Sequence, residues 1–206
     1  MGHTLIEKVI GAKVGHEVKP GDIVTVDVDW CMVDDIMAKF CINKFKEMGF
    51  TKVWDPNKIV FIYDHFLPAT QVDDTIAFKV ANEFVEEQGI KNVHRTDGIC
   101  HQLMIEQGYV KAGDIAFGTD SHTVTYGSVG AFSTGIGSTD MAAGMATGKA
   151  WFKVPSAIKF VLTGKPAPYI SGKDIILHII GMIGVDGALY KSMEFTGDGI
   201  SYLSMD

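Results

Sequence analysis

Cysteine is scarce in this chain, and clusters of positive charge are absent. Only three cysteines occur, Cys31, Cys41 and Cys100, and no two of them form a Cys-x-x-Cys pair. This spacing excludes a disulfide framework and a zinc knuckle, so we expect three thiols in a reducing compartment. No group of lysines and arginines stands out, and the formal net charge is −7. We therefore expect no nucleic-acid partner.

No apolar run is long enough to cross a membrane. The most apolar window, residues 175–185, contains His178 and is much shorter than the roughly 20 residues that span a bilayer. The first eight residues lack the apolar segment of a signal peptide. The sequence therefore predicts a cytoplasmic protein with no membrane partner.

The remaining composition is typical of a globular α/β protein. The 206 residues are 47% hydrophobic and 21% charged, which excludes a disordered chain. Short β-rich runs alternate with helical ones. We expect strands at residues 23–28, 59–63, 114–117 and 157–162, and helices at residues 4–10, 34–48, 74–88, 138–149 and 175–183.

A shift in composition at residues 151–155 predicts a domain boundary near residue 153. Residues 1–152 would form the first domain, and residues 153–206 would begin a second α/β domain. About 53 residues are few for an independent domain. We therefore expect the second domain to be truncated, with apolar surface exposed around residues 175–183.

Polar residues that suit acid–base chemistry follow two of the predicted strands. Asp64 and His65 follow the strand at residues 59–63, and Asp120 and His122 follow the strand at residues 114–117. Ligands of open α/β sheets bind at these carboxyl ends. A histidine that is oriented by a carboxylate can act as a general acid or base, and His101 is a third candidate.

Other interpretations of these residues are possible from the sequence. Ser121 lacks a Gly-x-Ser-x-Gly elbow, which argues against a serine hydrolase. The glycines at positions 135 and 137 match only part of a dinucleotide fingerprint and do not follow a predicted strand in the first βα unit. Imidazole and carboxylate groups also suit a divalent metal, so a mononuclear metal hydrolase stays open; its ligands would be Asp64, His65, His101, Asp120 and His122. A non-catalytic assembly module is the third alternative.

Longer motifs resemble the signature region of the aconitase superfamily. They run from Gly118 to Thr123, from Gly127 to Phe132 and from Gly135 to Ala142. The pair Asp64 and His65, residues 98–102, residues 154–165 and residues 173–177 follow the order found in that family. The resemblance covers essentially the whole chain and is greatest to the large subunits of 3-isopropylmalate dehydratases and homoaconitases.

The resemblance implies an aconitase-like three-layer α/β/α domain followed by part of a second α/β domain. It also implies a hydro-lyase, active in leucine biosynthesis in the dehydratase branch, that isomerises a hydroxy dicarboxylic acid by dehydration and rehydration. The substrate would be 3-isopropylmalate, with a homoaconitase or a dimethylmalate-type dehydratase as alternatives. A [4Fe-4S] cluster would act as a Lewis acid, and a small subunit would complete the site.

Site residues follow from the resemblance by motif position. His65, His101 and His122 would be the acid–base histidines, and Asp64 and Asp120 would orient them. Ser121 would contact the cluster and the substrate. Asp34 stands where the family usually has a histidine that faces the substrate, which leaves the identity of the substrate open.

The cysteines depart from the family pattern. The family's cluster ligands lie later in the large subunit, one alone and two as a Cys-x-x-Cys pair. Cys31, Cys41 and Cys100 do not match those positions, so we expect no metal ligand among them. The sequence thus predicts the N-terminal part of a large subunit, inactive by itself.

Overall fold

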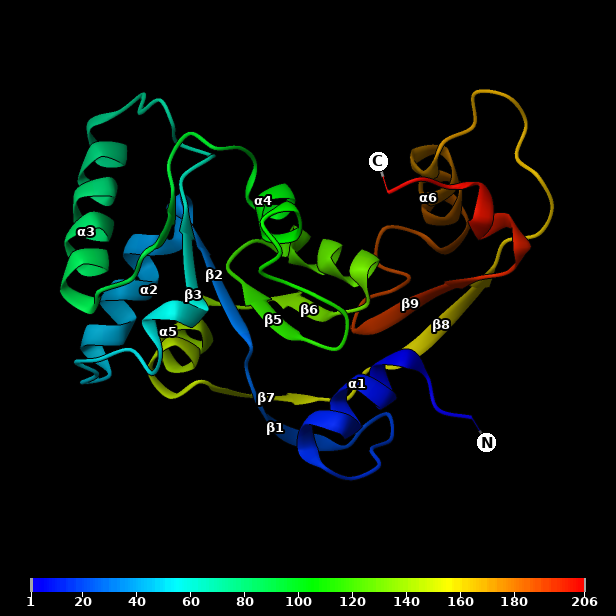
Figure 1. Ribbon diagram of the computed structural model, residues 1–206, viewed down its shortest axis with the longest axis horizontal. Helices are drawn as coiled ribbons and strands as arrows, with labels where there is room; N and C mark the ends of the chain where they lie inside the picture. Colours follow the sequence, from blue (N-terminus) through cyan, green and yellow to red (C-terminus); the bar gives the residue numbers. More distant parts are fainter. Residues whose placement is uncertain (1, 206) are drawn as a thin grey trace.

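A five-stranded parallel sheet forms the centre of the computed structural model, which describes residues 2–205 (Figure 1). Its strand order is β4-β3-β2-β5-β6, and every neighbouring pair is parallel. The strands are β2 (Trp30–Asp34), β3 (Ile59–Ile62), β4 (Asn92–His94), β5 (Ile115–Gly118) and β6 (Phe132–Gly135). The chain first adds β3 and β4 on one side of β2 and then adds β5 and β6 on the other. The direction of winding therefore reverses at β2.

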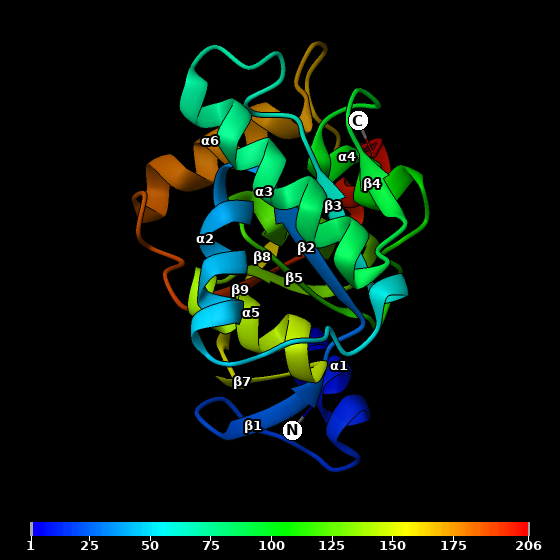
Figure 2. The ribbon, with the colours of Figure 1, turned by 90° about the vertical axis from the view of Figure 1, so that its left-hand side faces the viewer.

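This reversal places helices on both faces of the sheet, because parallel crossovers are right-handed. Helices α2 (Asp35–Glu47), α3 (Val72–Gln88) and α5 (Ser138–Thr147) cover one face, and Figure 2 shows them together on the near side. Helix α4 (Cys100–Glu106) and the 3₁₀ helix η2 (Ser121–Val129) cover the other. The result is a three-layer α/β/α arrangement, which confirms the predicted fold class.

Alternating side chains of the buried strands supply the two cores. In β2, Cys31 and Val33 pack with α2, α3 and α5, whereas Met32 points to the opposite face. In β3, Phe61 and Ile62 divide in the same way between the two cores. A strand that is buried on both faces shows no alternation of polar and apolar residues, which explains the continuous apolar run of β3.

A smaller sheet lies beside the central one. Strands β1 (Ile23–Asp27) and β7 (Lys149–Lys153) pair antiparallel, and helix α1 (Leu5–Val14) packs against β1. Val24 and Val26 of β1 are buried while their neighbours are exposed, as expected for a strand with one face toward water. Thr4 caps α1 by accepting a hydrogen bond from the backbone N–H of Glu7.

Residues 156–202 form a separate two-stranded sheet with a helix, at the right of Figure 1. Strands β8 (Ser156–Val161) and β9 (Lys191–Thr196) pair in parallel, followed by the 3₁₀ helix η3 (Asp198–Tyr202). Helix α6 (Gly172–Ile183) buries Ile179 but leaves Leu177 55% and Met182 61% exposed. The predicted apolar exposure around residues 175–183 is confirmed, whereas the domain division at residue 153 stays a prediction.

The structure differs from the sequence-based expectations in two places that position the site. Strand β2 was not predicted, because its residues run into α2 with no intervening turn and Asp34 caps the helix directly. Strand β6, which ends at Gly135 shortly before α5 begins at Ser138, was also not predicted. Strand β6 is only four residues long and ends in glycine, which is depleted in strands, so it gave no clear strand signal.

No helix within residues 2–205 has the length and apolar character needed to span a bilayer.

Candidate active site

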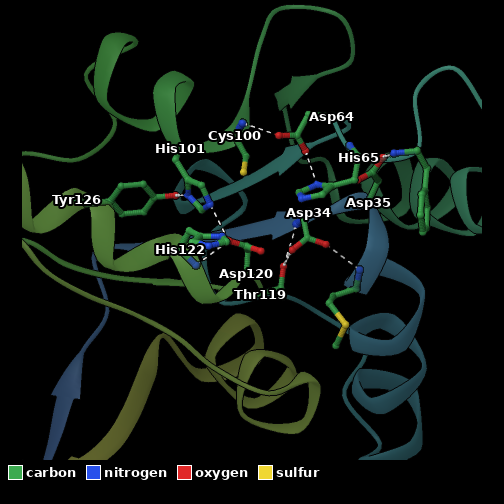
Figure 3. A network of polar contacts seen from close by, with 12 residues as sticks. Asp34, Asp35, Asp64, His65, Cys100, His101, Thr119, Asp120, His122 and Tyr126 are labelled. Carbon is green, nitrogen blue, oxygen red and sulfur yellow. Dashed lines mark hydrogen bonds and ion pairs between the residues drawn. The ribbon is translucent and has the colours of Figure 1, made fainter. Parts of the chain in front are cut away.

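The predicted polar residues lie at the carboxyl ends of β2, β3 and β5. Asp34 is the last residue of β2, Asp64 and His65 follow β3, and Asp120 follows β5 after one further residue. These three strands are neighbours in the sheet, and β2 is the strand at which the winding reverses. Such switch points are where open α/β sheets bind ligands. Figure 3 shows the side chains gathered at this edge.

The first group consists of one histidine and two carboxylates. Nδ1 of His65 lies 2.9 Å from Oδ1 of Asp64 and 3.5 Å from Oδ1 of Asp35. The two carboxylates are nearly inaccessible to solvent, whereas the His65 side chain is 34% exposed. Since a carboxylate can only accept, the hydrogen of the His65 ring is assigned to Nδ1 when the ring is neutral.

Asp35 fixes the backbone that carries His65. Its two carboxylate oxygens accept hydrogen bonds from the backbone N–H groups of His65, at 3.2 Å, and Phe66, at 2.8 Å. Asp35 is the first residue of α2, where the positive end of the helix dipole favours a negative charge. The sequence analysis does not select Asp35, because β2 runs directly into α2 and no turn marks the end of the strand.

The second group consists of one carboxylate and two histidines. Oδ1 of Asp120 lies 2.7 Å from Nε2 of His101 and 3.2 Å from Nδ1 of His122. The backbone N–H of His122 donates to the same oxygen at 2.7 Å, which makes Asp120 the cap of η2. His101 is largely buried, but the His122 side chain is 80% exposed. The two rings face one another edge to face.

Two glycines let the loop with Asp120 lie against the sheet. A Cβ at Gly118 would collide with the side chain of Thr123, whose hydroxyl donates to the carbonyl of Asp120. A Cβ at Gly135 would lie 2.6 Å from the same carbonyl oxygen. The glycine density in residues 118–148 therefore includes positions where the backbone itself needs the space.

The start of α4 joins the two groups. The backbone N–H of Cys100 donates to Oδ2 of Asp64 at 2.6 Å, and the next residue is His101. The structure thus brings together all five residues that the metal-hydrolase alternative invoked, but as two separate groups. In each group three potential ligand atoms lie within 4.8 Å of one another: Asp35, Asp64 and His65 in one, and His101, Asp120 and His122 in the other.

Asp34 lies between the groups and is already bound within the chain. Its Oδ1 accepts from the backbone N–H of Met37, which caps α2, and its Oδ2 accepts from the hydroxyl of Thr119. The backbone N–H of Asp34 donates to the same hydroxyl at 2.9 Å. Asp34 therefore ties the end of β2 to the end of β5. The other predicted contact residue, Ser121, is exposed at the start of η2.

Three atoms of the histidines and carboxylates in the two groups have no hydrogen-bond partner among the described residues. They are Nε2 of His65, Nε2 of His122 and Oδ2 of Asp120. In contrast, both nitrogens of His101 are engaged, since Nδ1 lies 3.2 Å from the hydroxyl of Tyr126. A histidine whose Nδ1–H is held by a carboxylate presents a basic Nε2, which is the arrangement of a general base.

Burial, hydrogen bonds and neighbouring charges shift the pKa values of His65, Asp120 and Asp34. Burial lowers the pKa of His65, but the carboxylates of Asp64, Asp34 and Asp35 outweigh it, so the net shift is upward. Burial raises the pKa of Asp120, yet its hydrogen bonds from His122 and His101 bring it below the ordinary range. The pKa of Asp34 is raised because its burial outweighs the hydrogen bonds that it accepts.

The cysteines do not fit an iron–sulfur cluster. Cys31 and Cys41 are buried within the core on the far face of the sheet, and burial raises the pKa of each thiol to about 12. Burial, together with the Asp64 carboxylate, also raises the pKa of Cys100, which lies in the other core. Cluster ligands are thiolates, so residues 2–205 do not supply a ligand set.

Comparisons with known proteins agree with the motifs. The model of the aconitase family (aconitate hydratase) matches residues 7–206. A protein of Clostridium botulinum (strain Eklund 17B / Type B), described as "3-isopropylmalate dehydratase large subunit", is 56% identical over 100% of this chain. Proteins of the same description from Acetivibrio thermocellus and Thermoanaerobacter pseudethanolicus are each 53% identical over 100% of the chain. In all three cases the chain spans 50% of the relative's length.

Proposed function

The chain belongs to the aconitase family. From this premise we propose that it forms half of the large subunit of a hydro-lyase that converts 3-isopropylmalate through an alkene intermediate. The observation that carries the proposal is the pair of histidine–carboxylate groups at the switch point of the sheet. Dehydration removes a hydroxyl from one carbon and a proton from its neighbour, and rehydration returns them in exchanged positions. Both directions need an acid–base group at the oxygen, which this chain would supply, and a base that takes the proton from the neighbouring carbon and later returns it, which we assign to the small-subunit partner.

We propose that His65 is the proton donor to the departing hydroxyl. Its free Nε2 is available to a ligand, and its raised pKa keeps more of the ring protonated near neutral pH than an ordinary histidine. Asp64 and Asp35 stabilise the resulting imidazolium. Since rehydration needs the reverse transfer, the same nitrogen would take the proton back from the attacking water.

We propose that Asp120 and His122 also exchange protons with the oxygen of the departing hydroxyl. The free Oδ2 of Asp120 is an acceptor whose lowered pKa keeps it ionised, and His122 presents its own free Nε2. We assign His101 to orient Asp120, because both of its nitrogens are engaged inside the chain. Ser121, beside His122 and exposed, is our candidate for a substrate contact, and Asp34 is a second candidate through its remaining lone pairs.

The cofactor and the partner belong to the complete enzyme. An iron–sulfur cluster would supply a Lewis acid that withdraws electrons from the departing hydroxyl. We propose that its ligands come from the half that this chain does not span, because the three cysteines here are buried thiols. The name "large subunit" of the relatives supports a small-subunit partner. A cytoplasmic enzyme of leucine biosynthesis follows from the same proposal.

A chimeric enzyme tests the proposed function. These 206 residues would replace the matching half of the Clostridium botulinum relative, to which they are 56% identical, and the product would be coexpressed anaerobically with that organism's small subunit. We expect the absorbance of a conjugated alkene to rise when 3-isopropylmalate is added. Failure of an assembled, iron-loaded chimera to form the alkene from this substrate would contradict the proposal. Homoisocitrate and dimethylmalate, assayed in parallel, separate the alternative substrates.

The metal-hydrolase alternative has its own observation, since each group offers three ligand atoms within 4.8 Å. Zinc titration of the chain distinguishes it from the main proposal. Tight binding of one zinc that is lost in both His101→Gln and His122→Gln would favour the hydrolase. We expect no stoichiometric binding, because Asp64 and Asp120 already accept hydrogen bonds from the chain.

A further inference from the structure

Tyr126 is a buried side chain that the proposed chemistry does not use. It lies in η2, has no exposed surface, and packs among the residues of the core beneath α4, including Cys100 and Met104. Its hydroxyl lies 3.2 Å from Nδ1 of His101, and the two rings are 5.8 Å apart. A buried phenolic hydroxyl usually finds a hydrogen-bond partner, and within the described residues Tyr126 has this one.

The direction of this hydrogen bond follows from the other side of the His101 ring. Nε2 of His101 lies 2.7 Å from the Asp120 carboxylate, which can only accept. In the neutral ring the hydrogen must therefore be on Nε2, which leaves a lone pair on Nδ1. The Tyr126 hydroxyl can then donate to Nδ1, and Nε2–H of His101 donates to Oδ1 of Asp120, so both nitrogens of the ring have a partner.

The opposite tautomer is penalised at both ends. With the hydrogen on Nδ1, the lone pair of Nε2 would face the carboxylate of Asp120, and the hydroxyl of Tyr126 would lose its only acceptor in the described chain. Leaving a buried hydroxyl without a partner is costly. Tyr126 and Asp120 thus select the same tautomer from opposite sides of the ring.

We propose that Tyr126 is a positioning residue that holds His101 in the Nε2–H tautomer and so orients Asp120 for the reaction. The inference rests on the proposed function, because it concerns the same carboxylate. Oδ1 of Asp120 takes the hydrogen bonds from His101 and His122, and this leaves Oδ2 directed away from them. If the ring of His101 becomes more mobile, the Asp120 carboxylate is therefore oriented less firmly, and with it the oxygen Oδ2 that is free for a ligand.

Nuclear magnetic resonance of ¹⁵N-histidine-labelled chain tests the tautomer without any assay of activity. At alkaline pH we expect the His101 ring to show a protonated Nε2 and an unprotonated Nδ1 that is shifted by its hydrogen bond. In Tyr126→Phe the Nδ1 resonance should move toward that of a free ring nitrogen. A wild-type ring with its hydrogen on Nδ1 would overturn the proposal even if the variant did not fold, as would an Nδ1 resonance unchanged in a folded variant.

Tyr109→Phe is the matched control. The hydroxyl of Tyr109 lies 2.9 Å from Nε2 of His94, outside the site, so this change removes a similar tyrosine–histidine hydrogen bond. We expect Tyr109→Phe to alter the His94 resonances and to leave those of His101 unchanged.

Kinetics of the chimeric enzyme test the consequence for Asp120. We expect Tyr126→Phe to lower kcat about fivefold with KM unchanged, the loss expected for one hydrogen bond. In an Asp120→Asn background the same change should have no further effect on kcat. A merely structural loss would persist in that background and overturn the proposal. If the wild-type chimera is inactive, the proposed function fails, while the resonance measurement still decides the role of Tyr126.

Discussion

The two histidine–carboxylate groups of the site combine the same kinds of side chain in opposite proportions. His65 faces two carboxylates, whereas Asp120 accepts from two histidines. The net pKa shift of His65 is upward and that of Asp120 is downward, despite a desolvation that opposes both shifts. The two carboxylates of the first group thus favour the protonated form of His65, and the two histidines of the second group favour the ionised form of Asp120.

The groups also differ in how firmly the chain holds them. The carboxylate of Asp35 is completely buried and accepts hydrogen bonds from two backbone N–H groups, which fixes the backbone of the loop that carries His65. In the second group the His122 side chain is 80% exposed and contacts Asp120 only through Nδ1 and its backbone. The chain therefore holds the first group more firmly, and the second group has the more exposed histidine.

The largest effect is expected from removing the shared carboxylate of the second group. Asp120→Asn deprives His101 and His122 of their common acceptor and takes away the free ionised oxygen. We expect kcat/KM of the chimeric enzyme to fall about 10³-fold, within the range of acid–base residues. Asp73→Asn, at an exposed position in α3, is the control and should retain full activity. Equal activity of both variants would contradict the assignment.

Substituting the three histidines separately sharpens the comparison. His65→Gln and His122→Gln each remove a free Nε2, and we expect kcat to fall about 10²-fold. His101→Gln removes a ring whose nitrogens are both engaged within the chain, so we expect a loss of only about tenfold. Steady-state kinetics of the three chimeric variants provide the measurement. A larger loss for His101→Gln than for the other two would mean that His101 itself transfers the proton.

The buried carboxylate of the first group should matter for stability. In the unchanged chain the backbone N–H groups of His65 and Phe66 both donate to the Asp35 carboxylate. In Asp35→Asn the amide NH₂ would face one of these N–H groups, which would lose its acceptor. We expect the free energy of unfolding to fall by about 2 kcal/mol, the cost of leaving a buried donor unpaired. Urea unfolding of Asp35→Asn beside Asp73→Asn measures the difference. A loss no larger than that of the exposed control would show that Asp35 does not hold the loop.

The smallest expected effect is that the two groups contribute to the free energy of unfolding with opposite pH dependence. The folded pKa of His65 is raised, so its contribution to stability is present below about pH 6.5 and is lost as the pH rises through the folded pKa. The pKa of Asp120 is lowered, so its contribution is present above about pH 3.9 and is lost as the pH falls through the folded pKa.

Unfolding measured across pH for His65→Gln and Asp120→Asn checks both signs. The stability difference between wild type and His65→Gln should shrink toward alkaline pH, and that for Asp120→Asn should shrink toward acid pH. We expect each change to be about 1 kcal/mol or less, because solvent screens these partly exposed pairs. Parallel pH profiles for the two variants would remove the distinction between the groups.

The sequence predicts most of the second group and only part of the first. A buried strand followed by Asp120, Ser121 and His122 is visible as a pattern, because the strand is apolar and the loop is polar. His101 is a candidate from the residues alone, and the aconitase resemblance, which the family match confirms, implies the same acid–base role. Its pairing with Asp120 depends on how α4 lies against η2, which no local pattern specifies.

Asp35 and Tyr126 show where sequence reasoning is insufficient. Strand β2 runs directly into α2, so the chain gives no turn signal that would mark Asp35 as the first residue after a strand end. Tyr126 lies in a 3₁₀ helix whose apolar residues have no clear period, and its contact with His101 spans 25 residues. Both side chains act through tertiary contacts, which the separation along the sequence does not reveal.

The pH dependence of kcat in the chimeric enzyme, with and without His65, tests most directly that this chain supplies the proton for dehydration. A proton donor with a raised pKa predicts a rate that falls on the alkaline side, at a pH above the ordinary histidine value of about 6.5. We predict that His65→Gln lowers kcat and abolishes that alkaline fall. An alkaline fall of unchanged position in His65→Gln would contradict the account.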